Sequence, residues 1–227
     1  MPEFKTTARV VGVLFIVASV SAIVGGLLAL PATEPGDLAA VAAAETQVVT
    51  GALIEMILVL SVVGIAVLLY PVLRHQSEGW ALAYVGARTL EAALLLAAAI
   101  SALVMLTLST EAAPAGVQVV LAIREWTYLI GSVLMFGTSA LILYPLLYRG
   151  NLVPAWLSLW GLAGGVLIIV SGLLEVYGVS VPEIVAGLLV APIALNEMVL
   201  ALWLIVRGFS PSSMARRATF AGVEGPA

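Results

Sequence analysis

Six long apolar segments occupy most of the 227-residue chain and constrain its fold more than any other feature. A run of about 20 apolar residues crosses the roughly 30 Å hydrocarbon core of a bilayer as an α-helix, at about 1.5 Å per residue. The connections between the segments are short, so little of the chain is left outside the membrane. The sequence therefore predicts an all-α, polytopic membrane bundle of six transmembrane helices, at about residues 8–30, 47–70, 80–108, 117–147, 155–177 and 184–206.

The composition excludes several other classes of protein. Only 10% of the residues are charged and 63% are hydrophobic, whereas a soluble domain has about 25% charged residues. The absence of cysteine excludes disulfides and thiolate metal sites, and the single histidine, His75, leaves no imidazole cluster for a metal. A net charge of −4 gives no sign of nucleic-acid binding. We expect a lipid bilayer as partner, with no metal, no cofactor and no nucleic acid.

The chain is expected to form one transmembrane domain, residues 1–209, followed by a disordered, Ser/Pro/Arg-rich cytoplasmic tail, residues 210–227. The first segment is too long for the apolar core of a signal peptide, so it is interpreted as a retained helix. After it, Asp37 is a plausible N-cap for a short outer helix, "LAAVAAAETQ", which could run straight into the second segment.

The distribution of basic residues predicts the orientation in the membrane. On one side of a six-helix serpentine the loops and ends are basic, whereas the opposite loops carry acidic residues such as Glu34 and Glu111. Because basic flanks stay in the cytoplasm, we expect a multi-pass protein of the cell membrane with both termini cytoplasmic. The basic residues on that side are Lys5, Arg9, Arg74, Arg149, Arg207, Arg216 and Arg217.

A weak internal repeat indicates three parallel two-helix units. The even-numbered helices share the phrases "ALIEM", "AIREW" and "ALNEM", which contain Glu55, Glu125 and Glu197. The odd-numbered helices share a spaced glycine, and repeats of this kind are common in membrane transport folds. Chance similarity between Leu/Ala-rich helices is the alternative. The shared glycines are Gly12, Gly86 and Gly161.

Several stretches are similar to a known family. "TARVVGVLFIVASV", "ALIEMILVLSVVGIAVLLYPVL", "EGWALAYVGARTLEAALL", "LVPAWLSLWGLAGGVL" and "NEMVLALWLIVRGF" resemble the uncharacterised bacterial membrane family called domain of unknown function 4386. The resemblance extends over roughly residues 6–209. It implies an integral membrane protein of six or seven helices, and it implies no activity.

Charged and amide side chains inside the predicted helices are candidate functional residues, because an unpaired charge in hydrocarbon costs several kcal/mol. Counted at about 1.5 Å per residue from the cytoplasmic end, they fall at two depths. The deeper set, at roughly 13–24 Å, is predicted to form one intramembrane polar site: Glu55, Arg88, Glu91, Asn196 and Glu197. The outer set, at roughly 30 Å, is predicted to form a second cluster: Arg124, Glu125 and Glu175.

The charge balance of the deeper set favours two interpretations. With three carboxylates and one guanidinium, at least one glutamate is expected to hold a proton or a bound cation at neutral pH, which is the chemistry of a proton or cation relay. Alternatively, the polar residues fix the register of the helices. Pro192, four residues before Asn196, is expected to break or kink the last helix beside a cavity. Glycines 161, 164 and 165 are expected to allow close helix contact.

Three classes of function are compatible with these features. The first is a small transporter or permease-like protein that handles a proton, a cation or a small solute. The second is a non-catalytic membrane subunit or regulator with a structural ion-pair core, which would bind a membrane protein partner or form a homo-oligomer. The third and least supported is an intramembrane enzyme, because the helices contain no Cys, no His and no recognisable Ser dyad.

Overall fold

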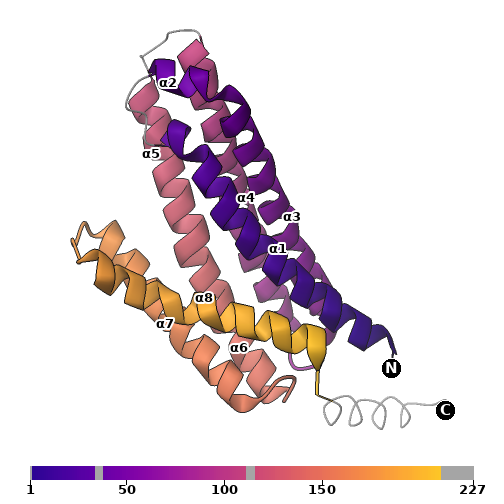
Figure 1. Ribbon diagram of the computed structural model, residues 1–227. Helices are drawn as coiled ribbons and strands as arrows, with labels where there is room; N and C mark the ends of the chain where they lie inside the picture. Colours follow the sequence, from indigo (N-terminus) through magenta and orange to yellow (C-terminus); the bar gives the residue numbers. More distant parts are fainter. Residues whose placement is uncertain (1, 34–37, 111–115, 211–227) are drawn as a thin grey trace, which may run out of the picture.

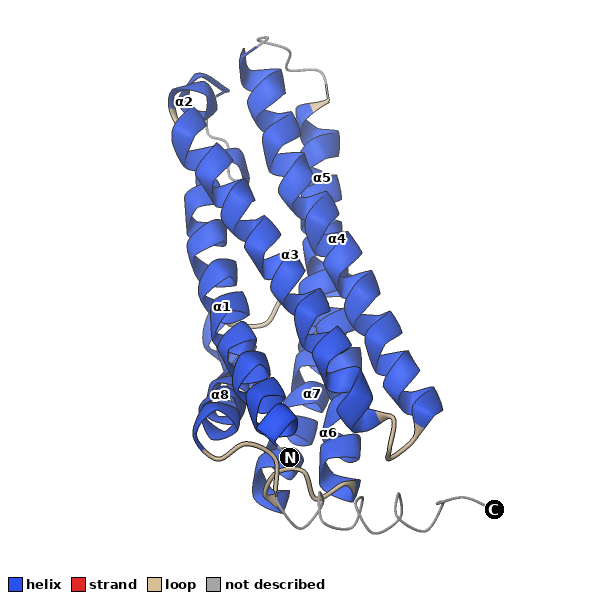
Figure 2. Ribbon diagram, turned by 90° about the vertical axis from the view of Figure 1, so that its right-hand side faces the viewer, coloured by secondary structure: helices blue, strands red, loops and turns tan. Residues whose placement is uncertain are grey.

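The computed structural model describes residues 2–33, 38–110 and 116–210, and every regular element in these ranges is helical (Figures 1 and 2). Asp37, Glu34, Glu111 and the predicted tail from residue 211 onward lie outside the described residues. The elements are α1 (Pro2–Thr33), α2 (Leu38–Ala43), α3 (Glu45–Leu73), α4 (Glu78–Thr110), α5 (Val117–Tyr128), η1 (Leu129–Met135), α6 (Phe136–Arg149), α7 (Ala155–Val176) and α8 (Glu183–Val206).

The described helices form six spans that are long and apolar enough to cross a membrane, which confirms the predicted six-helix bundle. The fourth span, Val117–Arg149, is composite, because α5, η1 and α6 follow one another without a break. The predicted short outer helix is also present as α2, and only Ala44 separates it from α3.

The long helices lie side by side, and the α7–α8 hairpin packs against one end of them. α1 contacts α3, α3 contacts α4, and α4 contacts α5, while the hairpin is held by contacts of α7 with α6 and of α8 with α1. Figure 1 shows the loop end of this hairpin standing apart from α1 and α5. Consistently, Ile184 and Leu188 in the first half of α8 are 79% and 66% exposed.

The largest buried cluster lies at the end of the bundle where the described chain begins and ends. It includes the fully buried side chains of Phe15, Tyr84 and Tyr144. At the same end, a Cβ placed on Gly208 would lie 3.8 Å from Ala8 and 3.8 Å from Lys5, so the two described ends of the chain meet there.

Glycines allow the helices to approach closely, which membrane helices need because lipid gives them no hydrophobic reason to associate. A Cβ at Gly164 would lie 2.9 Å from the backbone of Ile193 on α8, and one at Gly165 would lie 3.2 Å from Ala140 on α6. A Cβ at Gly161 would overlap the ring of Tyr144 on α6. The prediction that these three glycines make close helix contacts is therefore confirmed.

Candidate functional site

Arg88 is held in the interior of the bundle mainly by residues of its own helix. Tyr84, Arg88 and Glu91 share one face of α4 because residues three and four apart on an α-helix are neighbours. The Arg88 side chain is only 4% exposed, and its guanidinium donates from Nη1 to both carboxylate oxygens of Glu91, at 2.9 and 3.1 Å. It also donates from Nε to the hydroxyl of Tyr84 at 3.2 Å. Glu91 alone therefore neutralises the arginine.

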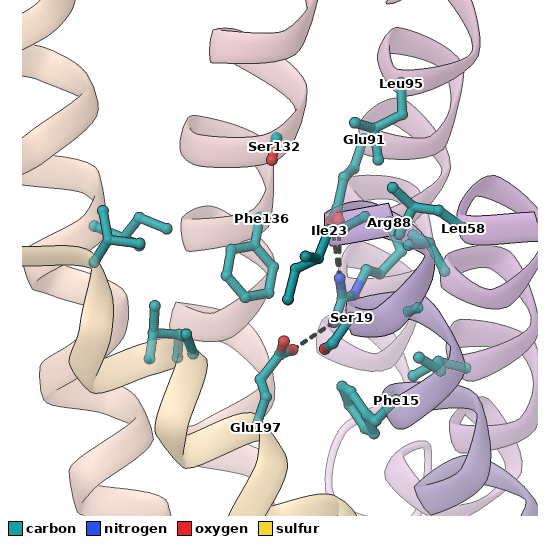
Figure 3. Close-up of a pocket in the computed structure, with 18 residues that line it drawn as sticks. Phe15, Ser19, Ile23, Leu58, Arg88, Glu91, Leu95, Ser132, Phe136 and Glu197 are labelled. Carbon is teal, nitrogen blue, oxygen red and sulfur yellow. Dashed lines mark hydrogen bonds and ion pairs between the residues drawn. The ribbon is translucent and has the colours of Figure 1, made fainter. Parts of the chain in front are cut away.

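Glu197 of α8 is the second carboxylate on this guanidinium, and it is held loosely. Its Oε1 accepts from Arg88 Nη2 at 3.5 Å (Figure 3), which is long beside the 2.7–2.9 Å of a strong charge-assisted hydrogen bond. Its side chain is 14% exposed, against 4% for Glu91. Two carboxylates therefore face one guanidinium, and Glu197 carries the surplus negative charge.

Three aromatic rings surround the same guanidinium. Its central carbon lies 6.0 Å from the ring centre of Phe15 on α1, 5.7 Å from Tyr84 on α4 and 5.3 Å from Phe136 on α6. Rings at this range attract a cation through the negative charge of their faces. The site therefore combines a desolvated ion pair with aromatic surfaces from three helices.

A cavity of about 270 Å³ lies beside this triad of Arg88, Glu91 and Glu197 (Figure 3). Besides the triad, its lining is polar only at Ser19 and Ser132 and is otherwise aromatic or aliphatic. We refer to it as the inner cavity. It brings a charged group and a largely apolar space together inside the membrane-spanning part of the protein.

Glu55 does not join Arg88, so this part of the predicted site is wrong. Glu55 instead accepts from Arg124 of α5, with Nη2 to Oε1 at 2.6 Å and Nη1 to Oε2 at 3.2 Å. Arg124 Nη1 also donates to the backbone carbonyl of Ala98 on α4. The sequence-based depths differ for these two residues because they were counted along the helix axes, at the Cα atoms. They did not include the length of the arginine side chain.

Glu125 and Glu175, the other members of the predicted outer cluster, do lie on one cavity with Arg124. This outer cavity has a volume of about 670 Å³ and is also lined by Gln118 and Tyr128. Both carboxylates are exposed. In the predicted repeat, Glu125 corresponds to Glu55 and Glu197, which are each bound to an arginine, so the three repeated glutamates have different environments. The three-unit repeat stays a prediction.

Asn196 does not line the inner cavity, which corrects its assignment to the predicted site. Its Nδ2 donates to the backbone carbonyl of Leu157 on α7 at 2.9 Å. Adjacent residues on an α-helix point about 100° apart, so Asn196 faces α7 while Glu197 faces α4. Pro192 does not break α8, which continues through it, so the predicted break is wrong and the alternative, a kink, stays a prediction.

The π-helical segment η1 is a feature that sequence reasoning missed. It covers Leu129–Met135 in the middle of the fourth span. Ser132 on η1 lines the inner cavity, whereas Leu129 lines the outer cavity, so η1 contributes to the walls of both. The apolar length of this segment predicted one helix at about residues 117–147, with no irregular segment inside it. Gly131 lies inside η1, and a Cβ there would lie 2.9 Å from Leu94 of α4. π-Helical segments often occur at functional sites.

The fold and this site define a polytopic α-helical membrane protein with a charged cavity between its helices. Residues 10–208 match the model of the family described as Domain of unknown function (DUF4386), and the chain belongs to that family. The family resemblance expected from the sequence is therefore confirmed. No curated protein and no solved structure matches the chain.

Proposed function

We propose that the protein is a small permease-like membrane protein that binds a proton or a monovalent cation at Glu197, beside the Arg88–Glu91 pair. The observation that carries the proposal is the surplus carboxylate on the inner cavity. Ionisable groups inside a membrane are expensive, and in membrane proteins they mark pathways for ions and protons. Because Glu91 already neutralises Arg88, the charge of Glu197 is available to a ligand.

The loose contact of Glu197 supports an exchange between two states. When a cation or a proton occupies the cavity, it neutralises Glu197, and the carboxylate separates from Arg88. When the ligand leaves, Glu197 returns to the guanidinium across the present 3.5 Å contact. Neither state leaves an isolated charge in hydrocarbon, which would cost several kcal/mol. The surplus carboxylate therefore offers a low-energy way to take up and release positive charge.

This function is tested by flux measurements on the full chain in liposomes. We expect Glu197→Gln to reduce proton or monovalent-cation flux by about tenfold or more, because the substitution removes the charge and keeps the shape. The matched control is Glu125→Gln, the same change at the exposed carboxylate of the outer cavity, which should leave flux unchanged. Equal flux in the wild type and in Glu197→Gln, or no flux in any variant, would overturn the proposal.

A second candidate, a non-catalytic membrane subunit or regulator, is favoured by the Arg124 network. Arg124 joins α5 to α3 and α4 through Glu55 and the Ala98 carbonyl. An arginine–carboxylate pair with two hydrogen bonds between helices stabilises the packing of a helix bundle. The two functions are distinguished by purification from the native membrane together with the flux test. A protein partner that co-purifies in stoichiometric amount, together with flux that is unchanged in Glu197→Gln, would favour the subunit or regulator.

We also propose that the chain lies in the cell membrane with both termini in the cytoplasm, because Arg9, Arg74, Arg149 and Arg207 flank one end of the helices. Fused after Ala227 in a bacterial host, green fluorescent protein should fluoresce, and alkaline phosphatase should be inactive. Alkaline phosphatase inserted between Thr110 and Val117 should be active. The reverse pattern of activities would show that the orientation is wrong.

A further inference from the structure

The lining of the inner cavity limits the kind of cation that it suits. A small inorganic cation such as Ca²⁺ takes six or more oxygen ligands. The oxygens on this cavity come from Glu91, Glu197, Ser19 and Ser132, and both oxygens of Glu91 are already bound to Arg88. Among the residues that the structure describes, no group of three or more His, Cys, Asp or Glu could hold a metal. The cavity therefore suits a ligand with an apolar body and one positive charge.

We propose that the ligand of the inner cavity is a monovalent, lipophilic organic cation, such as a quaternary ammonium or phosphonium with apolar arms. This inference rests on the proposed function and names its substrate class. Glu197 supplies the opposite charge, the rings of Phe15 and Phe136 supply faces that attract a cation, and aliphatic side chains such as Ile168 and Val62 surround the apolar arms.

The inner cavity reaches the surface at residues of α1 and α8. Near the chain ends these two helices touch closely, since a Cβ on Gly12 would lie 2.6 Å from the carbonyl oxygen of Ala201. Farther from that contact, Ile23 on α1 lines the cavity and is 63% exposed, and Ala194 on α8 also lines it and is exposed. Both residues lie within membrane-spanning helices. The exposed lining at Ile23 and Ala194 therefore gives a lipophilic cation dissolved in the bilayer a sideways route to Glu197.

The charge preference is tested with two probes of nearly the same shape and opposite charge, tetraphenylphosphonium and tetraphenylborate. Their binding is measured to the full chain in nanodiscs of neutral lipid, with empty nanodiscs subtracted. We expect the phosphonium to bind at least about tenfold more tightly than the borate, and Glu197→Gln to remove this preference, because an opposed charge pair contributes at least about 1.4 kcal/mol. Glu125→Gln should keep the preference. Equal binding of the two probes to the wild type would overturn the inference.

The sideways route is tested by narrowing it. Ala194→Trp should slow phosphonium association at least about fivefold, whereas Gly187→Trp should leave the rate unchanged. Gly187 is the control because it is exposed on the same helix and does not line the cavity, and a Cβ added there would meet no heavy atom within 4 Å. Equal association rates in the two variants would exclude this route.

The outcomes separate this inference from the proposed function. Flux of protons or small cations that depends on Glu197, together with equal binding of the two probes, would overturn the substrate class alone. If neither the flux nor the binding preference changes in Glu197→Gln, both proposals are overturned. Glu197→Gln keeps the size of the side chain, and an unchanged melting temperature of the variant will show that the comparison is made between folded proteins.

Discussion

Replacing Arg88 with methionine is expected to lower the free energy of unfolding by about 3–5 kcal/mol. The guanidinium is almost fully buried and is the cation bound by both Glu91 and Glu197. Without it, two carboxylates remain in a desolvated interior with no opposite charge. Methionine approximates the length of the aliphatic stem, so the loss reports charge more than volume. The measurement is reversible unfolding in mixed detergent micelles. Arg74→Met, at an exposed position after α3, is the control and should change stability little.

The partner substitutions show which carboxylate depends most on the arginine. Adding Glu91→Gln to Arg88→Met should recover more stability than adding Glu197→Gln, because Glu91 is the closer and more buried of the two. The double variant that retains Glu91 should remain the less stable. If the single variant Arg88→Met were as stable as the wild type, the triad would not stabilise the helix packing. The candidate site described around Arg88 would then be contradicted.

The helices could be predicted from the sequence because the bilayer leaves few alternatives. A segment of more than 20 apolar residues has room to cross the membrane in one way only, as a helix. The number of spans therefore followed from apolar length, and the outer helix α2 from the helix-start signal at Asp37. The pair Arg88–Glu91 was equally accessible, since three-residue spacing places both side chains on one face of α4.

The contacts between helices were less predictable, because they depend on rotation and on side-chain reach. The depth counted along the helix axes placed Arg124 and Glu55 in different clusters. An arginine side chain is nevertheless long enough to reach a carboxylate at the other depth. Asn196 and Glu197 are adjacent in the sequence and share a depth, but rotation about α8 directs one to α7 and the other to Arg88. Hydropathy contains no information on either variable.

The sequence indicated a cavity beside Pro192, but the lining of the inner cavity and the segment η1 were outside its reach for a related reason. A cavity is the space that several helices leave unfilled, and the lining of this one comes from α1, α3, α4, η1, α6, α7 and α8 together. The extra residue of a π-helical turn produces no composition signal in a chain that is apolar throughout. Pro192, which was expected to break or kink the last helix, does not interrupt α8.

Replacing Gly161 with alanine is expected to destabilise the protein by about 3 kcal/mol, at the upper end of the usual cost of overpacking. The new Cβ would overlap Cε1 and Cζ of Tyr144, far inside the separation that two carbon atoms tolerate. The ring has little freedom to move, because Tyr144 is only 2% exposed and belongs to the largest buried cluster. Thermal unfolding in detergent measures the loss.

Gly86→Ala is the matched control, because Gly86 occupies the corresponding position in the second unit of the predicted repeat. No heavy atom lies within 4 Å of a Cβ there, so alanine should be neutral, or should stabilise α4 by up to about 1 kcal/mol through its higher helix propensity. Adding Tyr144→Leu to Gly161→Ala should recover part of the loss by removing the obstructing ring. Equal melting temperatures for Gly161→Ala and Gly86→Ala would contradict the close contact between α6 and α7. The two glycines arise from one sequence pattern, so a difference between them would show that tertiary packing, and not the shared motif, determines what each position tolerates.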